Sequence, residues 1–332
     1  MQQETKKYLL DHLVSSPHPA SLPTEREMPA SEPTLAVIIP CYNSERSIRQ
    51  CLNSIISQQT DVEFDVIVVD SSSDQTAQIV EHEFPSVRLI KLNERAFAGV
   101  ARNVGIRATQ APYCLMIDSD CVAASDLIER AMARHREDIY AAVGGSLANG
   151  TPRSISGTIG YLIEFKEFMP SAPMRLVQSV PTANVTYRRE TLERYDCFDE
   201  VMWLAEDILL HWKMFQAGER ILFDPSIRVQ HLNKTGWREV FYYQIDLGRF
   251  SAIARKRGGL AGGILLKYPP LILLMPFARL LRAFTWLAKH DRKVLLAFLL
   301  IWPAYLLAAS FWSFGFLAEC RKKKPRRPSS LR

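Results

Sequence analysis

The chain has 332 residues, of which 48% are hydrophobic, and its formal net charge is +6 at pH 7. This composition supports a sizeable core and excludes a chain that is disordered throughout, and the length allows one large domain with appendages. The six cysteines form no closely spaced pair typical of zinc sites or disulfide frameworks, which favours a reducing, cytosol-facing environment. Residues 1–33 are polar and proline-rich without an apolar core, so we expect a flexible leader and no signal peptide.

Apolar runs of strand length alternate with segments of helical periodicity in the first part of the chain. The predicted strands are residues 35–39, 65–69, 87–91 and 113–117. The first is a continuous apolar run, as expected of a strand that is buried on both faces of a parallel sheet. A helix follows each of the first three strands: Asn43 or Ser44 can cap the first, the second ends near Phe84, and the third spans residues 98–108. Because strands that alternate with helices form βαβ units, the sequence predicts an α/β fold with a mainly parallel sheet.

Polar residues follow three of these strands at the point where each strand ends. Asn43 and Asp70 follow the first two strands, and Asp118 and Asp120, separated by one serine, follow the fourth. Ligands of open α/β sheets bind beyond the carboxyl ends of the strands, and one or two carboxylates suffice to hold a hard divalent cation that also binds phosphates. An isolated pair of this kind could be a solvated turn, but the three polar strand ends together predict a nucleotide-diphosphate site.

The middle of the chain gives weaker signals. We expect a helix over residues 126–136, with Asp126 as its cap and Glu129 three residues later. Further strands are expected at residues 141–145, 182–189 and 221–223. Residues 149–179 are locally aromatic, include Pro170 and Pro173 and show no clear period, so they are interpreted as an irregular excursion over the acceptor side.

An acidic pair opens a later helix. Glu206 and Asp207 precede the apolar-periodic residues 208–216, and Gly218 stops the helix. Acidic residues at this position can simply complement the helix dipole, or a rigidly placed carboxylate can take a proton from a reacting hydroxyl group. A final apolar–polar alternation leads to His231, which could ligate a metal ion or merely pack.

Five motifs along this stretch resemble those of the family 2 glycosyltransferases, which have the GT-A fold. In order and approximate spacing they are residues 37–43, 68–74, 101–105, 118–120 and 205–207. The resemblance covers residues 34 to 231. One departure is that Asp70 is followed by Ser71, where the family often has a second aspartate.

The resemblance implies a metal-dependent, inverting transfer of a sugar from a nucleotide donor. The residues that would border or bind the nucleotide sugar are Pro40, Tyr42, Asn43, Asp70, Arg102, Asn103 and Asp118. The residues that would hold Mn²⁺ or Mg²⁺ are Asp118, Asp120 and, as a further ligand, His231. Asp207 resembles the catalytic base, and Glu206 could orient it or bind acceptor hydroxyls. The strand that contains Asn184 falls where the family places acceptor-side residues, although it could equally be an ordinary strand with polar edges. Trp203, just before Glu206, could stack on an acceptor sugar ring or belong to the core.

The carboxyl-terminal part has the composition of a membrane anchor. Residues 294–318 contain no charged side chain over 25 positions, so we expect a transmembrane helix in which Pro303 is tolerated. Residues 236–293 are expected to form an amphipathic interfacial segment, a re-entrant element or a second span. Residues 319–332 form a basic tail that would rest on anionic lipid rather than on nucleic acid. The distribution of Lys and Arg favours both ends of the membrane segment on the cytoplasmic side of an inner or plasma membrane.

The combined prediction is a membrane enzyme whose GT-A domain, residues 34–235, faces the cytoplasm. It would transfer a sugar from a nucleotide donor, expected to be a UDP-sugar, to a lipid-linked or polysaccharide acceptor. Two alternatives stay open: a catalytically degenerate membrane scaffold, and a nucleotidyltransferase acting on a sugar phosphate. The latter class usually has a glycine-rich loop near the first strand, where this chain has Cys41-Tyr42-Asn43.

Overall fold

The computed structural model describes residues 33–322. Within this range, nine strands form one mixed sheet in the order β3-β2-β1-β4-β8-β6-β9-β5, and β7 pairs with the first residues of β9. The strands are β1 (Leu35–Cys41), β2 (Phe64–Asp70), β3 (Arg88–Lys91), β4 (Tyr113–Ile117), β5 (Cys121–Ala123), β6 (Ala142–Asn149), β7 (Arg175–Val177), β8 (Asn184–Arg188) and β9 (Ile221–His231).

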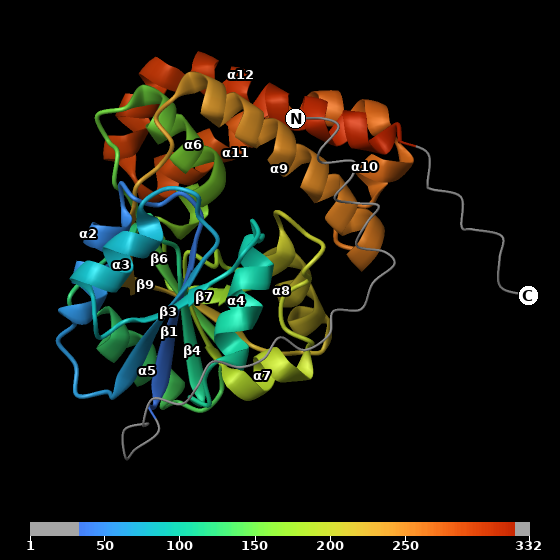
Figure 1. The fold of residues 1–332 in the computed structure, drawn as a ribbon. Helices are drawn as coiled ribbons and strands as arrows, with labels where there is room; N and C mark the ends of the chain where they lie inside the picture. The colour runs from blue at the N-terminus through green and yellow to red at the C-terminus, as the bar shows by residue number, and fades with distance from the viewer. Residues whose placement is uncertain (1–32, 323–332) are drawn as a thin grey trace, which may run out of the picture. The chain divides into compact units, whose positions relative to one another are not determined.

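Helices cover both faces of the sheet (Figure 1). They are α2 (Ile48–Ile56), α3 (Thr76–Glu83), α4 (Ala98–Arg107), α5 (Leu127–His135), α6 (Ile155–Phe165), the short 3₁₀ helix η1 (Lys166–Phe168), α7 (Arg189–Arg194) and α8 (Glu206–Gln216). One apolar cluster joins α2, α3 and α5 to one face, and a second joins α4, α7 and α8 to the other. Residues 35–39 of β1 are fully buried between the two layers, which explains the continuous apolar run in the sequence.

The α/β fold class is confirmed, but the sheet is mixed. Strands β3, β2, β1 and β4 are parallel, as predicted. Strand β8 then runs antiparallel to both β4 and β6. Hydrophobic runs show that strands exist, whereas strand direction depends on the connections between them, which the sequence pattern did not reveal.

Two local predictions were wrong. Residues 149–179 are not an irregular excursion, because they contain α6, η1 and β7. The predicted side-chain caps are also absent from the described chain: α2 begins later, at Ile48, and Asp126 makes no capping hydrogen bond but an ion pair with Arg130 instead. The ion pair competes with the cap for the same carboxylate, and the sequence alone does not show which interaction prevails.

The carboxyl-terminal region consists of helices. They are α9 (Trp237–Gly258), α10 (Ile264–Lys267), the 3₁₀ helix η2 (Pro269–Leu274), α11 (Met275–His290) and α12 (Arg292–Cys320). Two segments, Pro269–His290 and Arg292–Cys320, are long and apolar enough to cross a membrane, judged by length and composition alone. The predicted leader up to residue 32, and the tail from residue 323 onward, lie outside the described residues.

Two buried histidines predict acid sensitivity of the fold. Burial lowers the pKa of His135 to about 4 and that of His211 to about 3, and His211 is held neutral between Tyr187 and Ser179 at 2.7 and 3.1 Å. In the unfolded chain these groups titrate near pH 6.5. As the pH falls below about 6.5, the two histidines therefore become protonated in the unfolded state but not in the folded state. Each histidine then lowers the free energy of unfolding by about 1.4 kcal/mol per pH unit.

The variant His211→Gln removes one of these groups. We expect the free energy of unfolding of the variant to fall less steeply than that of the wild type between pH 6.5 and about pH 4. Urea unfolding at a series of pH values measures both slopes, and the difference between the two proteins isolates His211 from the carboxyl groups that titrate in the same range. Equal slopes would show that His211 is not held neutral.

Candidate active site

The polar residues that follow β1, β2 and β4 meet at one edge of the sheet, because these strands are parallel. Asn43 adopts a left-handed backbone conformation with φ 53° directly after β1, a conformation that asparagine tolerates better than most residues. Its side-chain oxygen accepts a hydrogen bond from the backbone N–H of Ser73 at 2.9 Å. The loops after β1 and β2 are therefore tied together at the carboxyl end of the sheet.

A serine links Asp70 to the same network. Ser72 donates its hydroxyl proton to Asp70 at 2.5 Å and accepts the backbone N–H of Asn43 at 2.7 Å. Burial raises the pKa of Asp70, and the hydrogen bond from Ser72 opposes that rise. Ser71, the position at which the chain departs from the family motif, is buried and donates its hydroxyl group to the backbone oxygen of Cys41 at 3.4 Å.

A buried arginine joins two of the predicted site motifs. The guanidinium group of Arg102, only 2% exposed, donates from one nitrogen to Asp118 at 2.7 Å and from the other to Glu206 at 2.5 Å. Burial opposes its charge, but the two carboxylates outweigh burial and raise the pKa of Arg102. The residue that was predicted to approach the nucleotide therefore also fixes the distance between the strand end of β4 and the start of α8.

Asn103 fastens the loop that leads into α8. Its amide nitrogen donates to the backbone oxygen of Phe198 at 2.9 Å, and its amide oxygen accepts the N–H of Phe198 at 3.0 Å. The same nitrogen also contacts Glu200 at 3.0 Å. The Asn103 side chain is buried, and both its polar atoms bind residues of this loop. Any contribution of Asn103 to a nucleotide site would therefore be indirect.

The acidic pair at the start of α8 follows an unusual backbone turn. Ala205, immediately before the helix, has φ 67°, a left-handed conformation that is strained for a residue with a Cβ atom. Glu206 is buried against Arg102, whereas Asp207 is partly exposed. Burial raises the pKa of both carboxyl groups, and Arg102 opposes the rise in each case. A carboxyl group with a raised pKa on a rigid helix start is suited to accept a proton.

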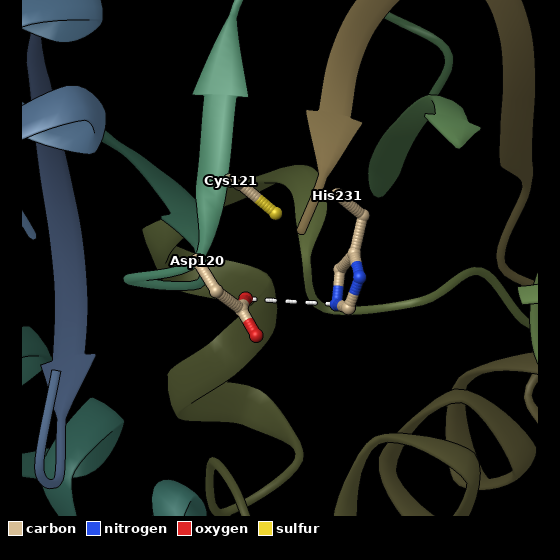
Figure 2. Close-up of side chains that lie close together, drawn as sticks. All are labelled: Asp120, Cys121 and His231. Carbon is tan, nitrogen blue, oxygen red and sulfur yellow. Dashed lines mark ion pairs between the residues drawn. The ribbon is translucent and has the colours of Figure 1, made fainter. Parts of the chain in front are cut away.

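Asp120 and His231 come together through a short strand that was not predicted from the sequence. Residues 121–123 form β5, which pairs antiparallel with the end of β9 so that Cys121 is opposite His231. This pairing brings the Nε2 atom of His231 to 3.5 Å from a carboxylate oxygen of Asp120 (Figure 2). Asp120, Cys121 and His231 offer ligand atoms within 4.8 Å of one another.

The residue types favour a hard divalent cation at this cluster. Burial raises the pKa of the Cys121 thiol well above its usual range, so this residue stays a thiol, and thiols that stay protonated are poor ligands. Asp120 and His231 offer an oxygen and a nitrogen, a donor set that suits Mg²⁺ or Mn²⁺ when carboxylates and phosphates complete the coordination. Asp118 lines the same cavity.

The hydrogen-bond network determines which nitrogen of His231 carries the proton. The backbone N–H of Thr151 donates to the amide oxygen of Asn149, and the amide nitrogen of Asn233 donates to the same oxygen, both at 3.0 Å. The amide oxygen of Asn233 must then face Nδ1 of His231, at 3.0 Å, so Nδ1 is the donor. In the neutral ring the lone pair is left on Nε2, toward Asp120. This is the arrangement by which a neighbouring group orients a metal-binding histidine.

A cavity of about 140 Å³ extends from these residues toward α6 and α9. Asp118, Asp120 and His231 line one side of it. The other residues that line it include Glu164 on α6, Lys234, and Tyr243 and Gln244 on α9. Burial raises the pKa of Glu164 to about 7. Gln244 is fully buried, and neither polar atom of its side chain has a hydrogen-bond partner within the described residues.

These further cavity residues were not predicted from the sequence. Glu164 is the one charged residue of the otherwise apolar segment Ile155–Phe165, and that isolated charge was the available signal. Tyr243 and Gln244 gave none, because α9 is amphipathic only weakly and lies far along the chain from the motifs.

Tyr42 and Trp203 both contact one arginine. The guanidinium carbon of Arg95 is 4.3 Å from the ring centre of Tyr42 and 5.8 Å from that of Trp203. Trp203 also packs against Phe97 and Phe250. Tyr42 is 41% exposed at the strand end, although Arg95 lies over its ring. Pro40 lies in β1 opposite Val69 of β2.

Asn184 lies in the sheet and not on an open surface. It is 1% exposed, and its amide nitrogen donates to the backbone oxygens of Ser146 and Ile227 at 3.2 and 3.1 Å. It thereby joins β6 and β9 at the position where their register shifts between Gly145 and Ser146. This geometry gives Asn184 a structural task, and any effect on an acceptor would be transmitted through the sheet.

Comparison with known proteins finds similarity to sugar-transferring enzymes. Residues 36–195 match the family described as Glycosyl transferase family 2. The Pre-mycofactocin glycosyltransferase of Mycobacterium tuberculosis is 25% identical over 245 residues, which cover 71% of this chain and 49% of that protein. The poly(ribitol-phosphate) beta-N-acetylglucosaminyltransferase TarS of Staphylococcus aureus is 31% identical over 199 residues, covering 56% of this chain and 33% of that protein. The chain thus spans half or less of the length of these two relatives.

Two solved structures share the fold. The mannosyltransferase PcManGT from Pyrobaculum calidifontis, solved in complex with GDP-Man and Mn²⁺, aligns with a TM-score of 0.59 and 19% identity over 96% of this chain and 92% of that one. Residues 1–349 of S. aureus TarS, solved in complex with UDP-GlcNAc, align with a TM-score of 0.50 and 20% identity, covering 86% and 90%. At these identities the likeness concerns the fold.

The chain thus shares its fold with solved glycosyltransferases, an enzyme class that takes sugars from activated donors. Over residues 36–195 the chain therefore resembles glycosyl transferase family 2.

Proposed function

We propose that this protein transfers a sugar, with inversion at the anomeric carbon, from a nucleoside diphosphate sugar to an acceptor at a membrane surface. The observation that carries the proposal is the single ion-paired network in which Arg102 connects Asp118, beside the cation cluster, to Glu206, beside Asp207. A donor site and a base are thereby held at a fixed separation. We expect a UDP-linked donor; the GDP-Man and UDP-GlcNAc complexes of the two structural neighbours support the broader class of nucleotide sugars.

The donor end needs a counter-charge. When the bond between the sugar and the diphosphate breaks, negative charge develops on the phosphate oxygens. Asp118, Asp120 and His231 would hold a divalent cation, Mn²⁺ or Mg²⁺, which when bound stabilises that charge as a Lewis acid. The Mn²⁺ in the PcManGT complex supports a divalent cation in this fold. Tyr42, with Asn43 and Asp70 at neighbouring strand ends, would receive the base and ribose.

The acceptor end needs a base. In a single displacement, the acceptor hydroxyl attacks the anomeric carbon on the face opposite the leaving diphosphate, so the configuration inverts and one carboxylate suffices. Asp207 would take the hydroxyl proton, and Glu206, fixed by Arg102, would hold Asp207 in place. General-base catalysis of this kind typically contributes about 10²–10⁴-fold to the rate.

The cavity between the strand ends and α6 and α9 is the proposed acceptor side. Its lining combines the Glu164 carboxyl group, the unpaired amide of Gln244 and the Lys234 ammonium group, and such groups hydrogen-bond sugar hydroxyls. The acceptor is proposed to be a lipid-linked glycan or a polysaccharide at the cytoplasmic face of a membrane, since the neighbouring helices are long and apolar.

The deciding experiment measures hydrolysis and transfer with a panel of UDP-, GDP- and dTDP-sugars, using full-length protein in detergent with and without a lipid extract. Turnover of one donor is expected with Mn²⁺ or Mg²⁺ and is expected to stop when a chelator is added, because the leaving diphosphate then lacks its counter-charge. The variant Asp120→Asn should lose the metal dependence together with the activity.

The other outcomes separate the alternatives. Turnover that is indifferent to the chelator would refute the cation site. No turnover and no nucleotide binding would favour a non-catalytic scaffold. Release of pyrophosphate from a nucleoside triphosphate and a sugar phosphate would indicate a nucleotidyltransferase, which the residues after β1 do not favour.

A further inference from the structure

The helix with the composition of a membrane span lies along the catalytic domain. Helix α12 runs beside α9 and over α6 (Figure 1). In its first half, Phe298 and Tyr305 share an apolar cluster with Ile159 and Leu162 of α6. Helix α6 is in turn fastened to the sheet, because Tyr161 donates a hydrogen bond to the backbone oxygen of Leu147 in β6 at 2.8 Å.

The second half of α12 is packed against α9, with backbone touching backbone. A Cβ atom added at Gly315 would lie 2.0 Å from the backbone oxygen of Ile245, and one added at Gly248 would lie 2.0 Å from that of Trp312. Near the end of both helices, Lys256 donates to the backbone oxygen of Glu319 at 2.8 Å. The helix is therefore held against the catalytic domain on both halves.

This packing is incompatible with α12 crossing a bilayer. Its 29 residues measure about 43 Å, longer than the hydrocarbon core of about 30 Å, so a crossing would draw α9 into the membrane alongside it. Helix α9 carries Arg238, Glu239, Asp246 and Arg249, and charged side chains in the hydrocarbon core are costly. The hairpin alternative meets the same obstacle at α11, where Arg282 is paired with Glu167 of η1 at 2.7 Å.

The face of α12 away from the domain is apolar and exposed. Its most exposed large residues are spaced along one side of the helix: Leu296, Leu299, Leu300, Leu307 and Phe314. Leu300 is 84% exposed. The preceding segment repeats the pattern over η2 and α11 with Leu273, Leu274, Phe277 and Leu281. Nothing within the described residues covers these side chains, and water is a poor environment for so many of them.

Basic residues frame this apolar face. From residue 259 to residue 322 the chain has two acidic side chains, Asp291 and Glu319, and both are engaged, in a helix cap and in ion pairs. The basic side chains of the same stretch are Lys267, Arg279, Arg282, Lys289, Arg292, Lys293, Arg321 and Lys322. Exposed Arg292 and Lys293 begin α12, and exposed Arg321 and Lys322 follow it. An apolar face with basic ends complements a surface of anionic lipid headgroups.

We propose that α11 and α12 lie in the plane of one anionic membrane leaflet, with their apolar faces at the boundary between headgroups and acyl chains, and do not cross the membrane. The catalytic domain then rests on the membrane through a broad surface. Helix α9 packs on α12 through Gly248 and lines the cavity with Tyr243 and Gln244, so the cavity is close to the lipid surface. This last consequence rests on the proposed function, whereas the membrane geometry does not.

Binding to lipid vesicles tests whether the apolar faces of α11 and α12 contact an anionic membrane. Full-length protein, with detergent removed, is expected to float with vesicles of phosphatidylcholine and phosphatidylglycerol, and to bind pure phosphatidylcholine more weakly. The double variant Leu296→Asp and Leu300→Asp should bind about tenfold more weakly or worse, without loss of folding because both side chains point into solvent. The control Ile139→Asp changes an exposed apolar residue in the loop after α5 and should leave binding unchanged.

Cysteine labelling from one side of the membrane tests whether α11 and α12 cross it. In sealed membrane vesicles with the catalytic domain outward, Lys293→Cys and Lys322→Cys should both react with a membrane-impermeant maleimide before detergent is added, above the wild-type background. Protection of position 293 would show that α11 and α12 span as a hairpin, and protection of position 322 alone would show a single span. Either result overturns the proposal, as would a dimer that buries this face and binds no vesicles. None of these measurements requires sugar transfer, so the proposed function can fail independently.

Discussion

Replacing Asp207 with asparagine is expected to abolish sugar transfer while leaving donor binding intact. The amide has nearly the shape of the carboxyl group, but it cannot accept the proton that the acceptor hydroxyl must lose. The expected loss in kcat is about 10²–10⁴-fold. Binding of the nucleotide sugar and of the divalent cation should be unchanged, because Asp118 and Asp120 lie between β4 and β5 and His231 ends β9, whereas Asp207 lies on α8. Turnover at saturating donor gives the first quantity, and calorimetric titration with the nucleotide gives the second.

A matched variant separates catalysis from helix stability. Asp126 also stands at a helix start, in an exposed ion pair with Arg130, so Asp126→Asn removes a comparable dipole interaction at a residue that does not line the cavity. Asp126→Asn should leave kcat unchanged. If Asp207→Asn retained wild-type turnover, or if it lost nucleotide binding in parallel with turnover, Asp207 would not be the base.

The hydrophobic pattern of the sequence was sufficient to predict the strands and helices whose burial is visible in a short stretch of chain. The four parallel strands that begin with β1 and the helices between them follow from apolar runs and helical periods, because β1, β4 and most of β2 are buried on both faces, and β3 at the sheet edge is partly buried. The direction of β8 and the existence of α6 could not be predicted in the same way. Helix α6 is apolar on nearly all sides, since it is covered by the sheet and by α12, and such a helix has little period to detect.

The residues of the candidate site also fall into two groups, those that could be predicted from the sequence and those that could not. Asp70, Asn43 and Asp118 were placed at one edge by strand ends, which the sequence reveals. The approach of His231 to Asp120 depends on the three-residue strand β5 and its pairing with β9. In this pairing Cys121 is opposite His231, which lies 110 residues later in the chain. The roles of Asn103 and Asn184 likewise depend on partners distant in the chain, Phe198 for the first and Ile227 for the second. The residue type of these two asparagines suggested contacts with a ligand, whereas their buried positions show that they bind other parts of the protein.

Replacing Arg102 with methionine is expected to destabilise the fold strongly. The side-chain volume is roughly kept, but Asp118 and Glu206 lose the cation between them, and the side chain of Glu206 is only 7% exposed. Removing one partner of a buried ion pair typically lowers the free energy of unfolding by about 3–5 kcal/mol, because the remaining charge is left uncompensated. Urea unfolding followed by tryptophan fluorescence, with a chelator present, measures the loss.

The double variant Arg102→Met and Glu206→Gln distinguishes this cause from simple loss of packing. If the uncompensated Glu206 charge is responsible, removing it should recover most of the lost stability, whereas a packing defect would persist. Arg102→Lys should fall between the wild type and Arg102→Met, since an ammonium group cannot reach both carboxylates with the forked geometry of a guanidinium group. Recovery of stability without recovery of transfer would further separate the two tasks of Arg102: it neutralises Glu206 within the fold, and it sets the separation between Asp118 and Asp207 on which the displacement depends.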